Sequence, residues 1–96
     1  MDVKFTPSAE NEFYSAVAYL LERNPTAADN FLDRVDKAIE RLEAFPESGS
    51  YIPEFPSSDY RQVFPTPYRF FYRIKNGVVW ITAVYYERQI PVRLEQ

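Results

Sequence analysis

An Asn-Gly pair in the second half of the chain places the tightest constraint on the fold. Asn76 and Gly77 stand between two apolar and aromatic runs, in the stretch YRQVFPTPYRFFYRIKNGVVWITAVYY of residues 60–86. A two-residue hairpin turn of type I′ needs positive φ at both central positions, which Asn tolerates and Gly adopts freely. The pair therefore predicts a β-hairpin whose second arm ends at Tyr86.

The same turn predicts which side chains share a face of the sheet, because side chains alternate along a strand. One face is expected to pair Lys75 with Val78, Arg73 with Trp80, Phe71 with Thr82 and Arg69 with Val84. The opposite face is expected to hold Tyr68, Phe70, Tyr72 and Ile74 against Val79, Ile81, Ala83 and Tyr85. The second set is the predicted core. The first set mixes three cations with large apolar groups, and this asymmetry calls for an explanation.

Composition excludes several classes of protein. The 96 residues suffice for one domain with one core, so we treat residues 1–96 as a single domain. The chain has no Cys and no His. A disulfide framework, a thiolate metal site and a histidine-based catalytic site are therefore excluded. No apolar run approaches the roughly 18 residues of a membrane span, and no signal-peptide pattern is present, so we expect a cytoplasmic protein.

Charge is divided unevenly along the chain. The net charge of −3 argues against a generic nucleic-acid binder, and no sequence-specific DNA binding is expected. Residues 1–59 contain five Lys or Arg against twelve Asp or Glu, whereas residues 60–96 contain six against two. The acidic part coincides with predicted helices, whose charged faces we interpret as solvated. The basic part coincides with the predicted hairpin.

The other elements follow from caps and periodicity. Residues 2–6 alternate and predict a short strand. Thr6-Pro7 and Asn24-Pro25 each combine a capping side chain with a proline suited to the first helical position. Apolar residues then recur at helical spacing, to about Arg23 in the first helix and to Phe45 in the second, which Pro46 ends. The short turn between the helices predicts an αα-hairpin.

The predicted fold is a two-layer α+β domain. Residues 46–59 are rich in Pro and Ser and form an irregular connection, which is either packed by its apolar residues or partly mobile. Residues 60–64 are expected to form a strand before the hairpin, and residues 90–94 alternate and could add a short edge strand. The order β-α-α-β-β-β places an αα-hairpin on a mostly antiparallel sheet.

With these elements in place, the chain resembles the RelE/ParE superfamily of bacterial toxins from type II toxin–antitoxin systems. The resemblance covers nearly the whole chain and is carried by VKFTPSAENEF, AIERLEAFPESG and YR…PYRFFYRI…VWITAVYYER. It is greatest to the ParE-like, plasmid-stabilisation branch. The resemblance implies a cognate antitoxin as partner and no cofactor. Members of the superfamily include ribosome-dependent mRNA endonucleases, poisons of DNA gyrase and proteins without demonstrated toxicity.

For the RNA-cleaving members, the resemblance implies a site on the open face of the sheet. Arg61, Arg69 and Arg88 fall at positions where such members carry basic residues, and Tyr86 could replace their tyrosine in space. Val63 occupies the place of a lysine. Arginines bind phosphate well but do not act as bases, so this set is incomplete for proton transfer. If the chain is an enzyme, a metal-independent endoribonuclease is expected.

The remaining residues of the same face are predicted to contact a partner. Phe71, Arg73, Trp80 and Val84 form this set, which either the C-terminal segment or a partner protein is expected to cover. We therefore interpret the chain as a toxin that an antitoxin neutralises and that inhibits DNA gyrase through protein contact. The alternatives are an mRNA endonuclease acting at the ribosome and a non-toxic module that only binds its antitoxin.

Overall fold

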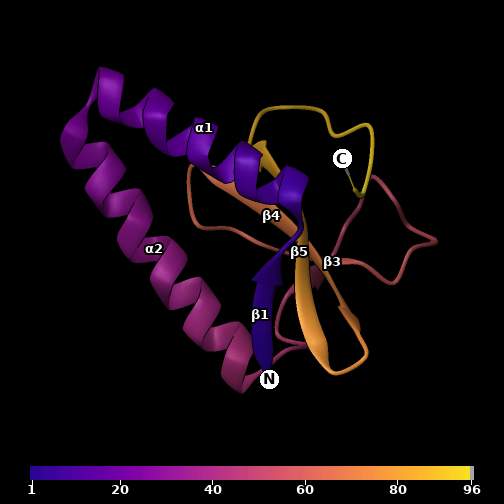
Figure 1. Cartoon of the computed structure of the whole chain (residues 1–96). Coiled ribbons are helices and arrows are strands. Elements are labelled where there is room, and N and C mark those ends of the chain that lie inside the picture. Colours follow the sequence, from indigo (N-terminus) through magenta and orange to yellow (C-terminus); the bar gives the residue numbers. More distant parts are fainter. Residues whose placement is uncertain (96) are drawn as a thin grey trace.

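The computed structural model describes residues 1–95 and contains two helices and a five-stranded sheet (Figure 1). The elements are β1 (Asp2–Phe5), α1 (Pro7–Arg23), α2 (Pro25–Ala44), β2 (Ser50–Tyr51), β3 (Arg61–Val63), β4 (Tyr68–Lys75) and β5 (Val78–Tyr86). The strand order is β1-β5-β4-β3-β2, in which β1 runs parallel to β5 and the other neighbours are antiparallel. The predicted two-layer α+β fold is confirmed.

Local capping determines where the helices begin. Thr6 Oγ1 accepts a hydrogen bond from Ala9 N at 3.3 Å, and Asn24 Oδ1 accepts one from Ala27 N at 3.2 Å. Asn24 also ends α1, because its backbone N donates to Leu20 O at 2.7 Å. A single residue thus separates the helices, as the sequence predicts. No helix within residues 1–95 is long and apolar enough to cross a membrane.

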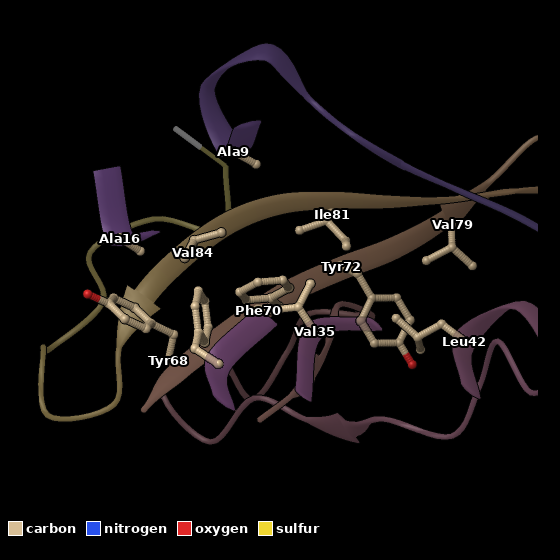
Figure 2. Close-up of a cluster of buried hydrophobic side chains, with 11 residues drawn as sticks. Ala9, Ala16, Val35, Leu42, Tyr68, Phe70, Tyr72, Val79, Ile81 and Val84 are labelled. Atoms are coloured by element: carbon tan, nitrogen blue, oxygen red, sulfur yellow. The ribbon is translucent and has the colours of Figure 1, made fainter. Parts of the chain in front are cut away.

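The main core lies between the helices and the sheet (Figure 2). Phe31 of α2 packs against Tyr68 of β4, with ring centroids 5.1 Å apart, and makes an edge contact with Phe70. Tyr72 is also buried here, and its hydroxyl donates to Pro46 O at 2.8 Å and accepts from Gly49 N at 2.9 Å. This phenol therefore ties the end of α2 to the sheet.

The hairpin forms as predicted at its turn but not along its whole length. Asn76 and Gly77 both have positive φ, and the pairs Lys75–Val78 and Arg73–Trp80 are confirmed. Beyond Tyr72–Ile81, a β-bulge at Thr82 shifts the register by one residue. Phe71 therefore pairs with Ala83 instead of Thr82, and Arg69 pairs with Tyr85 instead of Val84.

The bulge exchanges the faces of all residues that follow it in β5. Val84 joins the core beneath the helices, whereas Ala83 and Tyr85 move to the opposite face of the sheet and pack with Phe71. The predicted assignment of these three side chains is therefore wrong. The Thr82 hydroxyl at the bulge donates to Leu94 O at 2.7 Å. This contact comes from a distant segment, so alternation within β5 could not reveal it.

A second, smaller core covers the face of the sheet that the helices leave open. The loop after β2 contributes Ile52 and Phe55, and the C-terminal segment contributes Leu94. Figure 1 shows both segments on the side of the sheet away from the helices. Residues 46–59 are thus packed and also contain β2, a strand that we did not predict. The edge strand considered for residues 90–94 does not form.

Candidate functional site

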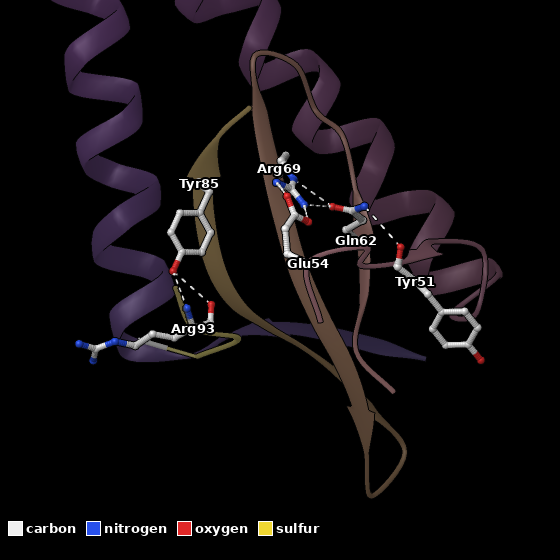
Figure 3. A network of polar contacts seen from close by, with 6 residues as sticks. All are labelled: Tyr51, Glu54, Gln62, Arg69, Tyr85 and Arg93. Carbon is white, nitrogen blue, oxygen red and sulfur yellow. Dashed lines mark hydrogen bonds and ion pairs between the residues drawn. The ribbon is translucent and has the colours of Figure 1, made fainter. Parts of the chain in front are cut away.

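Arg69 lies on the face of the sheet away from the helices and is almost fully buried, with 6% of its surface exposed. Its guanidinium makes two hydrogen bonds to the Glu54 carboxylate, at 2.9 and 2.8 Å, and two to Gln62 Oε1, at 3.0 and 2.8 Å (Figure 3). Bidentate pairing of this kind satisfies the planar guanidinium as a phosphate would. The expected phosphate-binding group is therefore already occupied by a carboxylate of the same chain.

The loop that carries Glu54 is held over this face by its apolar neighbours. Ile52 and Phe55 pack in the second core, and the ring of Phe55 meets that of Phe71 edge-on at 6.4 Å. The hydrogen bonds from Arg69 hold the pKa of the Glu54 carboxyl below its usual range. Glu54 did not emerge from the sequence as a site residue. A carboxylate flanked closely by Ile52 and Phe55 was the available signal.

Arg61 lies on the other face of the sheet. It pairs with Tyr72, which belongs to the core beneath the helices, so alternation separates Arg61 from Arg69. Its guanidinium lies 4.4 Å from the centroid of the Tyr51 ring and donates to Gly49 O at 2.9 Å. These contacts tie β3 to β2 and to the segment before it.

The two remaining candidates for cleavage lie at the end of β5. Tyr86 pairs with Tyr68 on the helix side of the sheet, and their rings meet edge-on at 5.6 Å. Arg88 is exposed in the turn that follows the strand. The structure thus separates Tyr86 and Arg61 from Arg69 by the thickness of the sheet, and the four residues do not share one surface.

The predicted partner-binding residues divide into two pairs. Phe71 is 0% exposed and Val84 is 6% exposed, and of the two covers expected for this set the C-terminal segment contributes Leu94 to the cluster around Phe71. Phe71 is covered by the chain's own loop, and the bulge moves Val84 under α1. Arg73 and Trp80 remain partly exposed. The Trp80 ring has Lys4 Nζ 5.9 Å from its centroid, and the Arg73 guanidinium lies 5.3 Å from the centroid of Tyr60.

A groove that we did not predict runs between α1 and the end of β5. We call it the α1–β5 groove; its volume is about 550 Å³, and it is lined by Asn11, Glu12, Ser15, Ala16, Tyr19, Tyr68, Val84, Tyr86 and Gln89. Strand β1 pairs with β5 only as far as Ile81, so β5 continues with its outer edge unpaired by a strand. Val84 N instead donates to Glu12 Oε1 at 3.0 Å, and Tyr86 N donates to Gln89 Oε1 at 3.1 Å.

The Glu12 carboxylate in this groove gives a testable pH dependence. Burial raises its pKa above the ordinary 4.5, against the hydrogen bond from Val84 N, which lowers it. The folded state thus binds the carboxyl proton more tightly than the unfolded state does. The stability gained from this tighter binding is present at low pH and is lost as pH rises through the raised pKa. We expect Glu12→Gln to raise the free energy of unfolding slightly at pH 7, because the amide oxygen can still accept from Val84 N without a partly buried charge.

Urea denaturation at pH 7 and pH 4 measures this effect. The Glu12→Ala variant is the control, because it leaves Val84 N without its acceptor and is expected to lose about 1 kcal/mol. The advantage of Glu12→Gln over the parent should shrink at pH 4, where the parent carboxyl is largely protonated. A glutamine variant as unstable as the alanine variant would contradict this account.

Comparison with known proteins agrees with the fold. The family model described as the ParE toxin of the type II toxin–antitoxin system parDE matches residues 3–91. A solved chain from the "Chromosomal ParDE TA system from P. aeruginosa" matches with a TM-score of 0.67 at 16% identity, covering 90% of this chain and 95% of that chain. The curated proteins contain no significant match. The family model spans nearly the whole chain, and the chain therefore belongs to the ParE toxin family of type II toxin–antitoxin systems.

Proposed function

We propose that this ParE-family toxin is neutralised by a cognate antitoxin and inhibits DNA gyrase through protein contact. The observation that carries this proposal is that the Arg69 guanidinium is already hydrogen-bonded to Glu54 and Gln62. Arg61 and Tyr86 lie on the opposite face of the sheet from Arg69. Inhibition by contact needs no catalytic side chain on the toxin. It is therefore compatible with a chain that divides its arginines between two faces.

The pKa shifts of three buried tyrosines exclude those three as general bases for cleavage. Cleavage by 2′-hydroxyl attack needs a general base, and a phenol serves as one only if its pKa is lowered. Burial raises the pKa of Tyr68 and Tyr72, and burial together with Glu95 raises that of Tyr60 to about 12. Each of these shifts makes the phenol a poorer base at neutral pH.

The α1–β5 groove supports the proposed antitoxin contact. Its lining is mainly apolar and aromatic, and Tyr19 of α1, which lines it, is 47% exposed. An exposed apolar and aromatic groove of this size is typical of a protein-binding surface. We propose that the antitoxin covers this groove, including the exposed ring of Tyr19.

Expression of the protein alone, and together with any small acidic protein that an adjacent gene encodes, tests the proposal. We expect growth arrest that the neighbouring protein relieves, an SOS response, linearised plasmid and loss of supercoiling by purified gyrase. The Arg88→Ala variant should arrest growth like the parent, because inhibition by contact needs no phosphate-binding side chain.

Two other outcomes separate the alternatives. Rapid cleavage of translated messages without DNA damage, lost on Arg88→Ala substitution, would indicate the endonuclease. Undisturbed growth with soluble expression and retained binding of the antitoxin would indicate a non-toxic binding module. Either result would overturn gyrase inhibition, whereas only failure to bind the neighbouring protein would overturn the antitoxin contact.

A further inference from the structure

Residues 93–95 lie across the face of the sheet that the helices leave open, and side chains hold them by their backbone. Thr82 Oγ1 donates to Leu94 O at 2.7 Å. The Tyr85 hydroxyl donates to Arg93 O at 3.1 Å and accepts from Arg93 N at 3.4 Å (Figure 3). Side chains that bond to the N–H and C=O groups of another segment recognise an extended peptide largely independently of its sequence.

Two further contacts give this surface a preference for particular side chains. The Leu94 side chain packs into the second core, which contains Ile52, Phe71 and Ala83. The Glu95 carboxylate accepts a hydrogen bond from the Tyr60 hydroxyl and lies 3.4 Å from Arg73 Nη2. The surface thus accepts an aliphatic side chain followed directly by a carboxylate. We call this surface, made by Tyr60, Arg73, Thr82 and Tyr85, the peptide groove.

Positive charge continues beyond the position of Glu95. A hollow of about 360 Å³ adjoins it, lined by Thr6, Arg73, Lys75, Asn76, Trp80, Thr82 and Glu95. Lys4 lies over the Trp80 ring at its border. Asp59 and Glu47 line a separate pocket on another side of Arg73, and Asp2 pairs with Val78 beside Lys75. The hollow itself is lined by two cations, Arg73 and Lys75, and one acid, Glu95, so a second carboxylate placed in it would face Lys75.

The C-terminal segment holds this position through few contacts. The side chains of Arg73 and Glu95 remain 34% and 43% exposed, and an ion pair this exposed contributes little. Ile90 and Val92 are 82% and 75% exposed, and residues 87–95 pair with no strand of the sheet. Exchange of residues 93–95 for another peptide would thus break a handful of hydrogen bonds, one ion pair and the packing of Leu94, whereas the buried Pro91 lies outside these residues.

We propose that the peptide groove is a docking site for an extended acidic segment of a partner protein, and that residues 93–95 occupy it in cis until that segment displaces them. A peptide fits this surface better than a nucleic acid does. The donors and acceptors of Thr82 and Tyr85 match backbone amides, and the chain's own occupant combines an aliphatic side chain with a carboxylate. The proposal concerns binding alone and does not depend on whether the protein is toxic.

Binding of a labelled peptide to the full chain tests the proposal. The probe is an acetylated, amidated peptide with the sequence of residues 91–95, Pro-Val-Arg-Leu-Glu, measured by fluorescence anisotropy. The full chain that binds the probe, the host variant, carries Leu94→Ser and Glu95→Gln, which weaken the hold of its own residues 93–95 on the peptide groove. In the parent these residues compete with the probe at an effective concentration in the millimolar range, as expected for a short tether. We expect the host variant to bind the probe about tenfold or more tightly than the parent does.

Matched controls define the contacts. A probe with Gln in place of Glu, and the same host with Arg73→Gln added, should each weaken binding several-fold, which charge-assisted pairing predicts. Trp80, the only tryptophan, lies in the adjoining hollow, so its emission should change on binding. If the double variant loses its folded near-ultraviolet circular dichroism spectrum, the Glu95→Gln single variant replaces it.

Three results would overturn the proposal. These are the absence of probe binding to a folded host variant at millimolar concentration, equal binding of the Glu and Gln probes, and preferential binding of oligothymidylate at the same surface. The last result would indicate a nucleic-acid site. None of them bears on growth arrest, so failure here is distinguishable from failure of the proposed gyrase inhibition.

Discussion

Glu54→Gln is expected to lower the free energy of unfolding by about 2 kcal/mol at pH 7, because it leaves the Arg69 guanidinium buried without its carboxylate. Gln62 still accepts two of the hydrogen bonds, and Glu54 itself is 37% exposed in its side chain. The loss should therefore stay below that for a fully buried pair. Urea denaturation of the parent and the variant measures it.

The same loss is expected to disappear in acid. The pKa of Glu54 is lowered in the folded state, so its contribution is present above the ordinary 4.5 and is lost as pH falls through the lowered value. Below that value the parent carboxyl is protonated and resembles the glutamine. A difference between parent and variant that is independent of pH would contradict the role assigned to this ion pair.

A second substitution separates structure from function at this site. Adding Arg69→Met to Glu54→Gln removes the unpaired cation and should recover much of the lost stability, since apolar replacement of a buried pair is often close to neutral. A gyrase inhibitor should keep its growth arrest in this double variant. Loss of arrest in a protein of restored stability would show that Arg69 itself contacts the target.

Gly49→Ala is expected to lower the free energy of unfolding by about 3 kcal/mol, through overpacking. A Cβ at this position would lie 2.6 Å from Gln62 O and 2.6 Å from the Tyr72 hydroxyl. The first neighbour is backbone and the second is buried, so neither can move without disturbing the sheet. The contact between α2 and the sheet would open, and the bond from Arg61 to Gly49 O would weaken.

Gly77→Ala is the matched control for this prediction. No atom lies within 4 Å of a Cβ built there, but φ is +73°, so the cost is the backbone strain alone, roughly 1 kcal/mol. Chemical denaturation should thus rank Gly49→Ala as the more damaging change. The opposite ranking would mean that the segment around Gly49 repacks to admit a methyl group.

Features that depend on neighbouring residues were predictable from the sequence. The helices begin at Thr6 and Asn24 because a side-chain oxygen within three residues caps the first turn. The turn forms at Asn76-Gly77 because those residues tolerate positive φ. The αα-hairpin, the antiparallel hairpin and the core face of β4 follow from these local choices and from periodicity.

Features that depend on distant residues were not predictable. The bulge at Thr82 changes the register by one residue, and the run Ile81-Thr82-Ala83-Val84 alternates plausibly in either register. The hydroxyl of Thr82 bonds to Leu94, twelve residues away. Val84 therefore moved from the expected surface to the core beneath α1, and the α1–β5 groove could not be foreseen.

The sequence by itself determined the two-layer fold and the order of its elements except β2, because caps, turns and periodicity act over a few residues. The family was indicated by the resemblance of its motifs. The sequence also placed a set of arginines in the sheet half of the chain. Only the tertiary structure decided which groups those arginines contact. Electrostatic pairing acts through space, and the packing of the loop after β2 brings Glu54 onto Arg69, while strand alternation directs Arg61 to the other face.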